Sequence, residues 1–337
     1  MLFLKEVKKS HTNITLLDRV LAPLYKYIDF LERFNDFIAI RHAVKNWPTV
    51  MLFRISLKHT FTMHLRDGKK VEIKRQADYF NFWNSEKGQY ILLHTKGFTR
   101  GIIINMHQHI ASIEFQNKNV LFNYSSIKQL GNACSMIKEQ FIRKDYKWLK
   151  VYNLDVVDIG ANIGDSAIYF GLNGAKHVYA FEPYPSTYKL AIKNVKSNKL
   201  ENKITILNQG CGKSTMSILI PELYESSSDA KIRKFTRGKA IKIVTLKKIV
   251  EEYNVTDAIL KIDCEGCEYG ILINAPNTVL RRFKQVQIEY HYGYLDIKRK
   301  LESAGFIVKN TLPRYHFDTG TENQPMLIGM LYAERNE

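Results

Sequence analysis

The chain has 337 residues, of which 45% are hydrophobic and 12% aromatic, so it can bury a core and is not a disordered protein. Its formal net charge is +17, and residues 1–150 hold most of the excess, with 25 Lys and Arg against 12 Asp and Glu. Four cysteines, no recognisable secretory leader and no apolar run long enough to span a membrane predict a cytoplasmic protein without a disulfide scaffold.

Residues 1–148 are predicted to form a smaller N-terminal module, which is a candidate substrate or partner region. Apolar residues at three-and-four spacing over residues 15–44 predict an amphipathic helix, whose mixed-charge polar face favours packing on the protein over a membrane surface. The predicted strands are Val50–Ile55, Tyr90–Leu93, Ile102–Met106, Ile110–Phe115 and Val120–Tyr124. Asp67-Gly68 predicts a hairpin turn. The basic charge indicates either a solvated surface or a face for a polyanion such as nucleic acid.

Residues 149–337 show alternating strands and helices. The predicted strands are Leu154–Ile159, Val178–Phe181, Ile204–Leu207, Ile259–Ile262, Val286–Tyr290, Phe306–Val308 and Met326–Tyr332, with helices beginning at Gly164 and Ser186. This pattern predicts a doubly wound α/β fold with a mostly parallel sheet. Ligands bind at the carboxyl ends of the strands in such sheets, so a site is expected there.

The first of these strands runs into a glycine turn, Asp158-Ile-Gly160-Ala161-Asn162-Ile-Gly164-Asp165. The dinucleotide pattern G-x-G-x-x-G is absent, which disfavours a nicotinamide dehydrogenase. S-adenosylmethionine (SAM) has no phosphate, and its methionine end carries an ammonium and a carboxylate. A carboxylate of Asp158 or Asp165 suits the ammonium, and the turn amides suit the carboxylate.

The second and third strands end in further polar groups. Glu182, in Phe181-Glu182-Pro183, lies 22 residues after Gly160, where a carboxylate can accept hydrogen bonds from both ribose hydroxyls; the alternative is a helix cap beside Pro183. The third strand is followed by Gln209-Gly210, which we expect near the adenine edge.

The fourth and fifth strands end in an acidic cluster with one histidine. Asp263 and Glu265 follow the fourth strand, and alternation along the fifth places Glu289 and His291 on one face, so these four side chains are expected to converge. Such a cluster suits a general base for a hydroxyl, with His291 the first choice, then Asp263 and Glu289. A divalent metal held by Asp263, Glu265 or Glu289 is an alternative that we do not predict, and a purely structural role for His291 also stays open.

Cys264 and Cys267 form a C-x-x-C sequence that lacks a second pair for zinc and the helix-start setting of a redox motif. We predict that both are small buried residues.

Together these segments resemble the FkbM family of methyltransferases over residues 150–335, with Lys261-Ile-Asp263-Cys-Glu265-Gly266-Cys-Glu268 the most specific part. The resemblance implies a class I (Rossmann-like) methyltransferase sheet with a final antiparallel strand and transfer of the SAM methyl group to a hydroxyl of a sugar, glycan or other small molecule. It also implies cofactor binding at Asp158, Gly160, Asn162, Gly164 and Glu182, with Asp263 and Glu265 near the methyl group.

The full predicted cofactor site is Asp158, Gly160, Ala161, Asn162, Gly164, Asp165, Glu182, Pro183, Gln209, Gly210 and Asp263, and the predicted catalytic residues are His291, Asp263, Glu289 and Glu265. Two alternatives remain: an RNA methyltransferase that uses the basic N-terminal module, and a catalytically silent SAM-binding interaction protein. The sequence predicts no oligomeric state.

Overall fold

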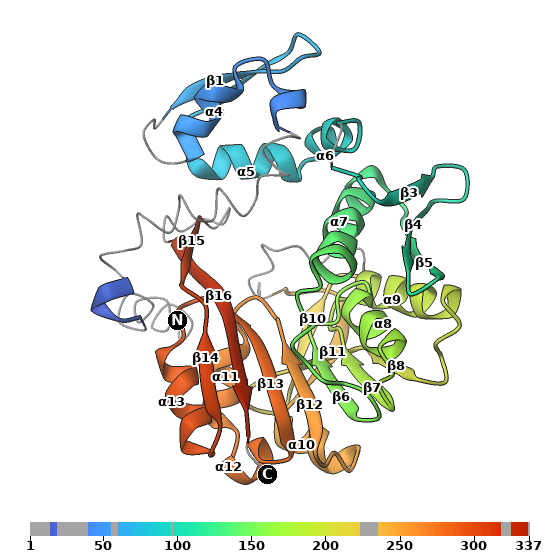
Figure 1. The fold of residues 1–337 in the computed structure, drawn as a ribbon, viewed down its shortest axis with the longest axis vertical. Coiled ribbons are helices and arrows are strands. Elements are labelled where there is room, and N and C mark those ends of the chain that lie inside the picture. The colour runs from blue at the N-terminus through green and yellow to red at the C-terminus, as the bar shows by residue number, and fades with distance from the viewer. Residues whose placement is uncertain are drawn as a thin grey trace. The chain divides into compact units, whose positions relative to one another are not determined.

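The computed structural model describes residues 14–18, 40–54, 60–95, 98–222, 235–317 and 325–335 (Figure 1). The chain divides into two compact units. The first comprises residues 1–16, 139–313 and 327–337, and the second residues 17–138 and 314–326. The amphipathic helix predicted over residues 15–44 lies largely outside the described residues. No helix in the described part of the chain is long and apolar enough to cross a membrane.

The second unit contains two small antiparallel sheets with helices between them. Its elements are α4 (Trp47–Arg54), β1 (Phe61–His64), β2 (Lys70–Ile73), α5 (Gln76–Asn84), α6 (Glu86–Leu93), β3 (Ile102–Asn105), β4 (Ile110–Phe115), β5 (Lys118–Asn123), α7 (Ile127–Ile137) and β15 (Arg314–Phe317). The hairpin predicted at Asp67-Gly68 is confirmed, since β1 pairs with β2 around Gly68, whose φ is +89°. The predicted strands at β3, β4 and β5 are also confirmed.

Two strands predicted in this unit are helices instead. Val50–Ile55 falls mostly in α4, where Val50 and Phe53, three residues apart, are both fully buried on one face. Tyr90–Leu93 is the end of α6, which begins at Glu86 because the hydroxyl of Ser85 accepts a hydrogen bond from Gly88 N and caps it. A short apolar run does not by itself distinguish a strand from a buried helix. Here the spacing of the buried residues in α4 and the serine cap of α6 agree with helices.

The first unit is built on one large mixed sheet in the order β14-β16-β13-β12-β6-β7-β8 (Figure 1). Its elements are a π-helix (Lys138–Arg143), β6 (Asp155–Ile159), α8 (Asp165–Leu172), β7 (His177–Phe181), α9 (Pro185–Ser197), β8 (Ile204–Leu207), α10 (Leu246–Glu252), β12 (Ala258–Ile262), α11 (Glu268–Asn274), α12 (Asn277–Leu280), β13 (Phe283–Tyr290), α13 (Leu295–Ser303), β14 (Ile307–Asn310) and β16 (Pro325–Glu334). Strands β13, β12, β6, β7 and β8 pair in parallel with their neighbours in this order, whereas β16 is antiparallel to β13 and β14. The predicted fold class is confirmed.

The order of the sheet reverses between β6 and β12, and this point positions the site. After β6 the chain builds outward through β7 and β8, whereas β12 lies on the other side of β6 and is followed outward by β13. Every residue of β12 is buried, as expected for a central parallel strand. The crevice outside the carboxyl ends of strands at such a reversal is where open α/β sheets bind ligands.

A second, three-stranded sheet of this unit was not among the predicted elements. It consists of β9 (Gln209–Cys211), β10 (Met216–Ile220) and β11 (Lys239–Val244), with β11 parallel to β9. Ile241 and Ile243 are buried and Lys242 between them is exposed, which is the alternation typical of a strand, so the sequence does carry the signal for β11.

Candidate active site

The turn between β6 and α8 brings the backbone against the end of β12. Gly160 and Gly164 have φ of +81° and +84°, and Asn162 has +46°, all in the left-handed region. A Cβ atom at Gly160 would collide with the carbonyl oxygen of Asp263. Position 160 therefore needs glycine for two reasons, the dihedral and the contact between the two strand ends.

The amides of this turn are bonded mainly to the protein itself. Gly160 N and Ala161 N both donate to the carbonyl of Phe181, at 3.0 and 3.1 Å, and Gly164 N donates to Ala161 O at 2.8 Å. Asn162 N donates to Oε2 of Glu182 at 3.0 Å. The turn is thus tied to the end of β7, and these four amides are not free donors for a ligand carboxylate.

Asp158 lies behind the turn and is fully buried. Its Oδ1 is 3.0 Å from Nζ of Lys261, which also donates to Gly160 O at 2.7 Å, and its Oδ2 accepts from Ser166 Oγ at 2.6 Å. Burial alone would lower the pKa of Lys261, but the charges of Asp158 and Asp263 outweigh it and raise that pKa. Asp158 therefore supports the glycine turn through Lys261, a residue that the sequence analysis did not single out.

Asp165 opens α8 and is 5% exposed. Burial raises the pKa of its carboxyl group to about 7, against the opposing charge of Lys261. A ligand ammonium beside it would keep it ionised.

Glu182 follows β7 with its carboxylate held by two backbone amides. Oε2 accepts from Asn162 N at 3.0 Å and Oε1 from Tyr184 N at 2.9 Å, and the residue is 3% exposed. Burial raises its pKa to about 8, although both hydrogen bonds favour the ionised form. The two oxygens are fixed in place, and each retains a lone pair for a further donor.

The residues predicted near an adenine lie beside Glu182. A Cβ atom at Gly210 would lie 3.4 Å from Cβ of Pro183, so the start of β9 packs on the segment after β7. Asn208 Nδ2 donates to the carbonyls of Glu182 and Pro183 at 3.1 and 3.0 Å. Asn208 joins these two strand ends, and Gln209 is half-buried next to it.

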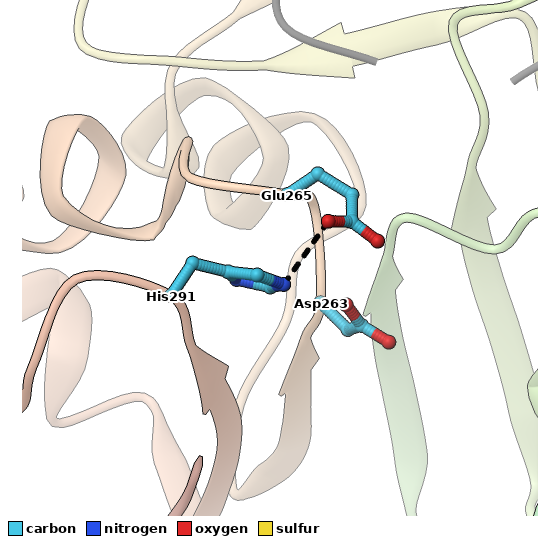
Figure 2. Close-up of side chains that lie close together, drawn as sticks. All are labelled: Asp263, Glu265 and His291. Atoms are coloured by element: carbon cyan, nitrogen blue, oxygen red, sulfur yellow. Dashed lines mark ion pairs between the residues drawn. The ribbon is translucent and has the colours of Figure 1, made fainter. Parts of the chain in front are cut away.

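The ends of β12 and β13 bring three predicted catalytic side chains together. Asp263, Glu265 and His291 each offer a ligand atom, and these atoms all lie within 4.8 Å of one another. Figure 2 shows the His291 ring pointing at the Glu265 carboxylate, with Asp263 beside them. The chain brings the three groups together because β12 and β13 are adjacent and parallel.

His291 is held between two carboxylates and is 2% exposed. Its Nδ1 is 2.9 Å from Glu268 Oε1, and its Nε2 is 3.2 Å from Glu265 Oε2. Burial alone would lower the pKa of His291, but the charges of Glu268 and Glu265 raise it well above its ordinary value. In this arrangement the ring is an imidazolium that bridges a fully buried acid and a partly exposed one.

Glu289, on the same face of β13, is part of the same electrostatic group. Burial raises the pKa of its carboxyl group to about 8, the charge of Asp263 adds to this effect, and the charge of His291 opposes it. Glu289, the fourth predicted catalytic residue, therefore interacts electrostatically with Asp263 and His291.

The prediction that Cys264 and Cys267 are small buried residues is wrong. They form a disulfide with Cα atoms 5.5 Å apart, and both are half-buried. The reason is the backbone between them: Glu265 and Gly266 have φ of +57° and +109°, which reverses the chain within two residues. Glu265 is therefore presented from inside a four-residue ring closed by the disulfide.

We expect the oxidised protein to be more stable than its Cys264→Ser/Cys267→Ser variant by about 2 kcal/mol, the chain-entropy value for so short a ring. Urea unfolding with and without a thiol reductant measures this difference. Reductant should lower the stability of the wild type to that of the variant and leave the variant unchanged. A wild type indifferent to reductant would contradict the prediction.

Glu268 is a further functional residue that sequence reasoning missed. It is fully buried, and its Oε1 accepts from Cys264 N and Gly266 N at 3.1 and 3.2 Å as well as meeting His291. The charge of His291, against the effect of burial, lowers its pKa. The last acid of the K-x-D-x-E-G-x-E block was a signal for this role, because an acid in a buried strand-end block needs a partner.

The sheet order with its antiparallel β16, the glycine turn at its centre and the acid after β7 are typical of class I methyltransferase domains, which use SAM. Residues 158–308 match the model of the methyltransferase FkbM domain.

Several solved structures resemble the chain. It is similar to methyltransferase FkbM from Methylobacillus flagellatus KT, with 15% identity over 61% of this chain and 54% of that chain and a TM-score of 0.40. It thus spans about half the length of that protein. It is also similar to a SAM-dependent methyltransferase from Agrobacterium tumefaciens, with 12% identity over 68% and 70% of the two chains and a TM-score of 0.41. No curated protein matches the chain.

Proposed function

We propose that this protein transfers the methyl group of SAM to a hydroxyl oxygen of a sugar or another polyhydroxylated small molecule. The observation that carries the proposal is the cluster of Asp263, Glu265, Glu289 and His291 at the strand ends next to the glycine turn. A hydroxyl loses its proton as it attacks, and a nearby proton acceptor contributes roughly 10²–10⁴-fold to such a step. Carboxylates are hydrogen-bond acceptors, so the cluster suits an acceptor molecule rich in hydroxyl donors.

One strand end of the chain fits SAM. The anchored carboxylate of Glu182 offers two acceptors for the hydroxyls of a ribose. When bound, SAM supplies an electrophilic methyl group on a sulfonium. The protein then positions the hydroxyl, excludes water and removes the proton.

In this proposal the proton passes to the carboxylate–imidazole cluster. Glu265 is its accessible member, with a side chain about a third exposed, whereas His291 and Glu268 are buried behind it. The buried pair fixes the position of Glu265, and positive charge on His291 stabilises a carboxylate beside the reacting oxygen.

The experiment is incubation of the full chain with methyl-labelled SAM and separate panels of sugars, glycan fragments and RNA. Label on a sugar hydroxyl is the expected result. Label only in RNA would favour the alternative that the basic N-terminal module recognises nucleic acid, with binding that weakens steeply as salt is added. SAM binding without transfer to any acceptor would favour a silent interaction protein.

Glu182 gives a prediction for the pH dependence of SAM binding. If the carboxylate form accepts the ribose hydroxyls, affinity should rise with pH and level off above about 8, the pKa of Glu182. Well below that pKa the fraction of carboxylate, and hence the affinity, falls about tenfold per pH unit. Calorimetric titrations between pH 6 and 9 measure this.

Glu182→Gln is the matched variant, since the amide keeps the shape and cannot ionise. At pH 9 it should bind SAM roughly 10–100-fold more weakly, as expected for loss of hydrogen bonds to a charged group. The part of the pH dependence centred on 8 should disappear. Equal affinity of wild type and variant would show that Glu182 only caps the following segment.

A further inference from the structure

We propose that Asp263, Glu265 and His291 bind one divalent metal ion, with Glu268 as the outer partner that orients the histidine. The three donors are one imidazole nitrogen and two carboxylates, and their ligand atoms lie within 4.8 Å of one another (Figure 2). Adjacent ligands of a six-coordinate ion with bonds of about 2.1 Å are about 3 Å apart. The side chain of Glu265 is about a third exposed, so its rotation can close the remaining gap.

Glu268 lies where a metal-binding histidine usually has a hydrogen-bond acceptor for its second ring nitrogen. Such histidines donate their other ring nitrogen to a carboxylate or carbonyl, which fixes the ring and directs the free nitrogen at the metal. Nδ1 of His291 is 2.9 Å from Oε1 of the fully buried Glu268, and Nε2 faces the two other acids. Metal binding at Nε2 would release the proton of that nitrogen to solvent and would replace the present contact with Glu265 by two ligand bonds to the same ion.

The charge balance at these strand ends also favours a cation. Asp263, Glu265, Glu268 and Glu289 face a single imidazole. The buried Lys261, whose pKa the charge of Asp263 also raises, makes its ion pair with Asp158 and its short hydrogen bond with Gly160. Oε2 of Glu268, a buried atom, has no hydrogen-bond partner in the described part of the chain. A divalent ion offsets this excess of negative charge.

The three ligand residues limit which metal ions the site would bind and which class of methyl acceptor would fit it. Mixed nitrogen and oxygen ligands suit Mn²⁺, Fe²⁺ or Zn²⁺ better than ions that prefer oxygen alone. Three protein ligands leave positions open, and two neighbouring hydroxyls of one molecule fit them. We therefore assign the methyl acceptor to the class of vicinal diols, a step that rests on the proposed function. Glu289 is not one of the three ligands, so its carboxylate is available to accept the proton of the reacting hydroxyl. A bound metal lowers the pKa of a coordinated hydroxyl.

The test titrates the chelator-treated full chain with Mn²⁺ alone and follows the electron paramagnetic resonance signal of the free aqueous ion. We expect one ion bound per chain, affinity reduced at least tenfold by His291→Ala and by Glu265→Gln, and affinity reduced roughly 10–100-fold by Glu268→Gln. Glu201→Gln, at an exposed turn residue remote in sequence, is the control and should bind like the wild type. Circular dichroism shows that each variant is folded.

No retained Mn²⁺, or equal retention by the wild type and folded Glu265→Gln, would overturn the metal site. The result for the metal site can be distinguished from the result for the proposed methyl transfer. Stoichiometric Mn²⁺ binding without methyl transfer supports the metal site and contradicts the function, whereas full transfer in the presence of chelator, with no Mn²⁺ bound, does the reverse.

Discussion

Replacement of His291 by Ala is expected to lower kcat for methyl transfer by roughly 10²–10⁴-fold, the range for general acid–base assistance, because Glu265 loses the charged partner that positions it as proton acceptor. The Kd for SAM should change less than about twofold, because the cofactor contact proposed for Glu182 lies at the end of another strand, β7. Calorimetry with SAM measures the Kd, and initial rates with an acceptor that the protein methylates measure kcat.

The matched control for this prediction is His177→Ala. His177 starts β7, at the opposite end of the strand from Glu182, and its Nε2 is 2.8 Å from Thr205 Oγ1. This variant should keep the kcat of the wild type. Turnover that survives in His291→Ala, or falls equally in both variants, would remove His291 from the reaction.

Glu268→Gln tests whether the orientation of His291 matters for methyl transfer, because Glu268 contacts the histidine and does not reach the reacting atoms. Glu268 contacts His291 and two backbone amides but has no exposed surface, so it acts through the histidine. We expect a lower kcat with an unchanged KM for SAM.

Lys261→Met is expected to destabilise the fold by about 3–5 kcal/mol, because it leaves the buried carboxylate of Asp158 without its cation. Lys261 and Asp158 are 2% and 0% exposed and pair at 3.0 Å, and the same ammonium holds the carbonyl of Gly160. The free energy of unfolding in urea measures the loss.

Two variants test the cause of that loss. Lys176→Met removes a cation whose partner is Asp155 at 3.5 Å and whose own side chain is 64% exposed, so it should change stability by less than about 1 kcal/mol. Adding Asp158→Asn to Lys261→Met should recover part of the stability, since the unpaired charge is removed. A loss below about 1 kcal/mol in Lys261→Met would show that Asp158 does not depend on the ion pair.

Much of the methyltransferase domain follows from local sequence pattern. The strands β6, β7, β8, β12, β13 and β16 contain short apolar runs, and alternation on β13 placed Glu289 and His291 on one face. The glycine turn was predicted because positive φ at Gly160 and Gly164 needs residues without a Cβ. In the second unit the same type of signal failed at α4 and α6, since a short apolar run fits a buried helix as well as a strand.

The sequence by itself determined where most strands of the large sheet lie along the chain, where the glycine turn lies and which acids follow strands. These features depend on residue spacing within a few positions. Only the tertiary structure decided the partners across strands. Lys261 meets Asp158 because β12 lies beside β6 in that register, and Glu268 meets His291 because α11 starts beside the end of β13. The disulfide inside the acidic block likewise needed the left-handed backbone at Glu265. Such pairings join residues far apart in the chain or depend on its exact dihedrals, and residue spacing does not specify either.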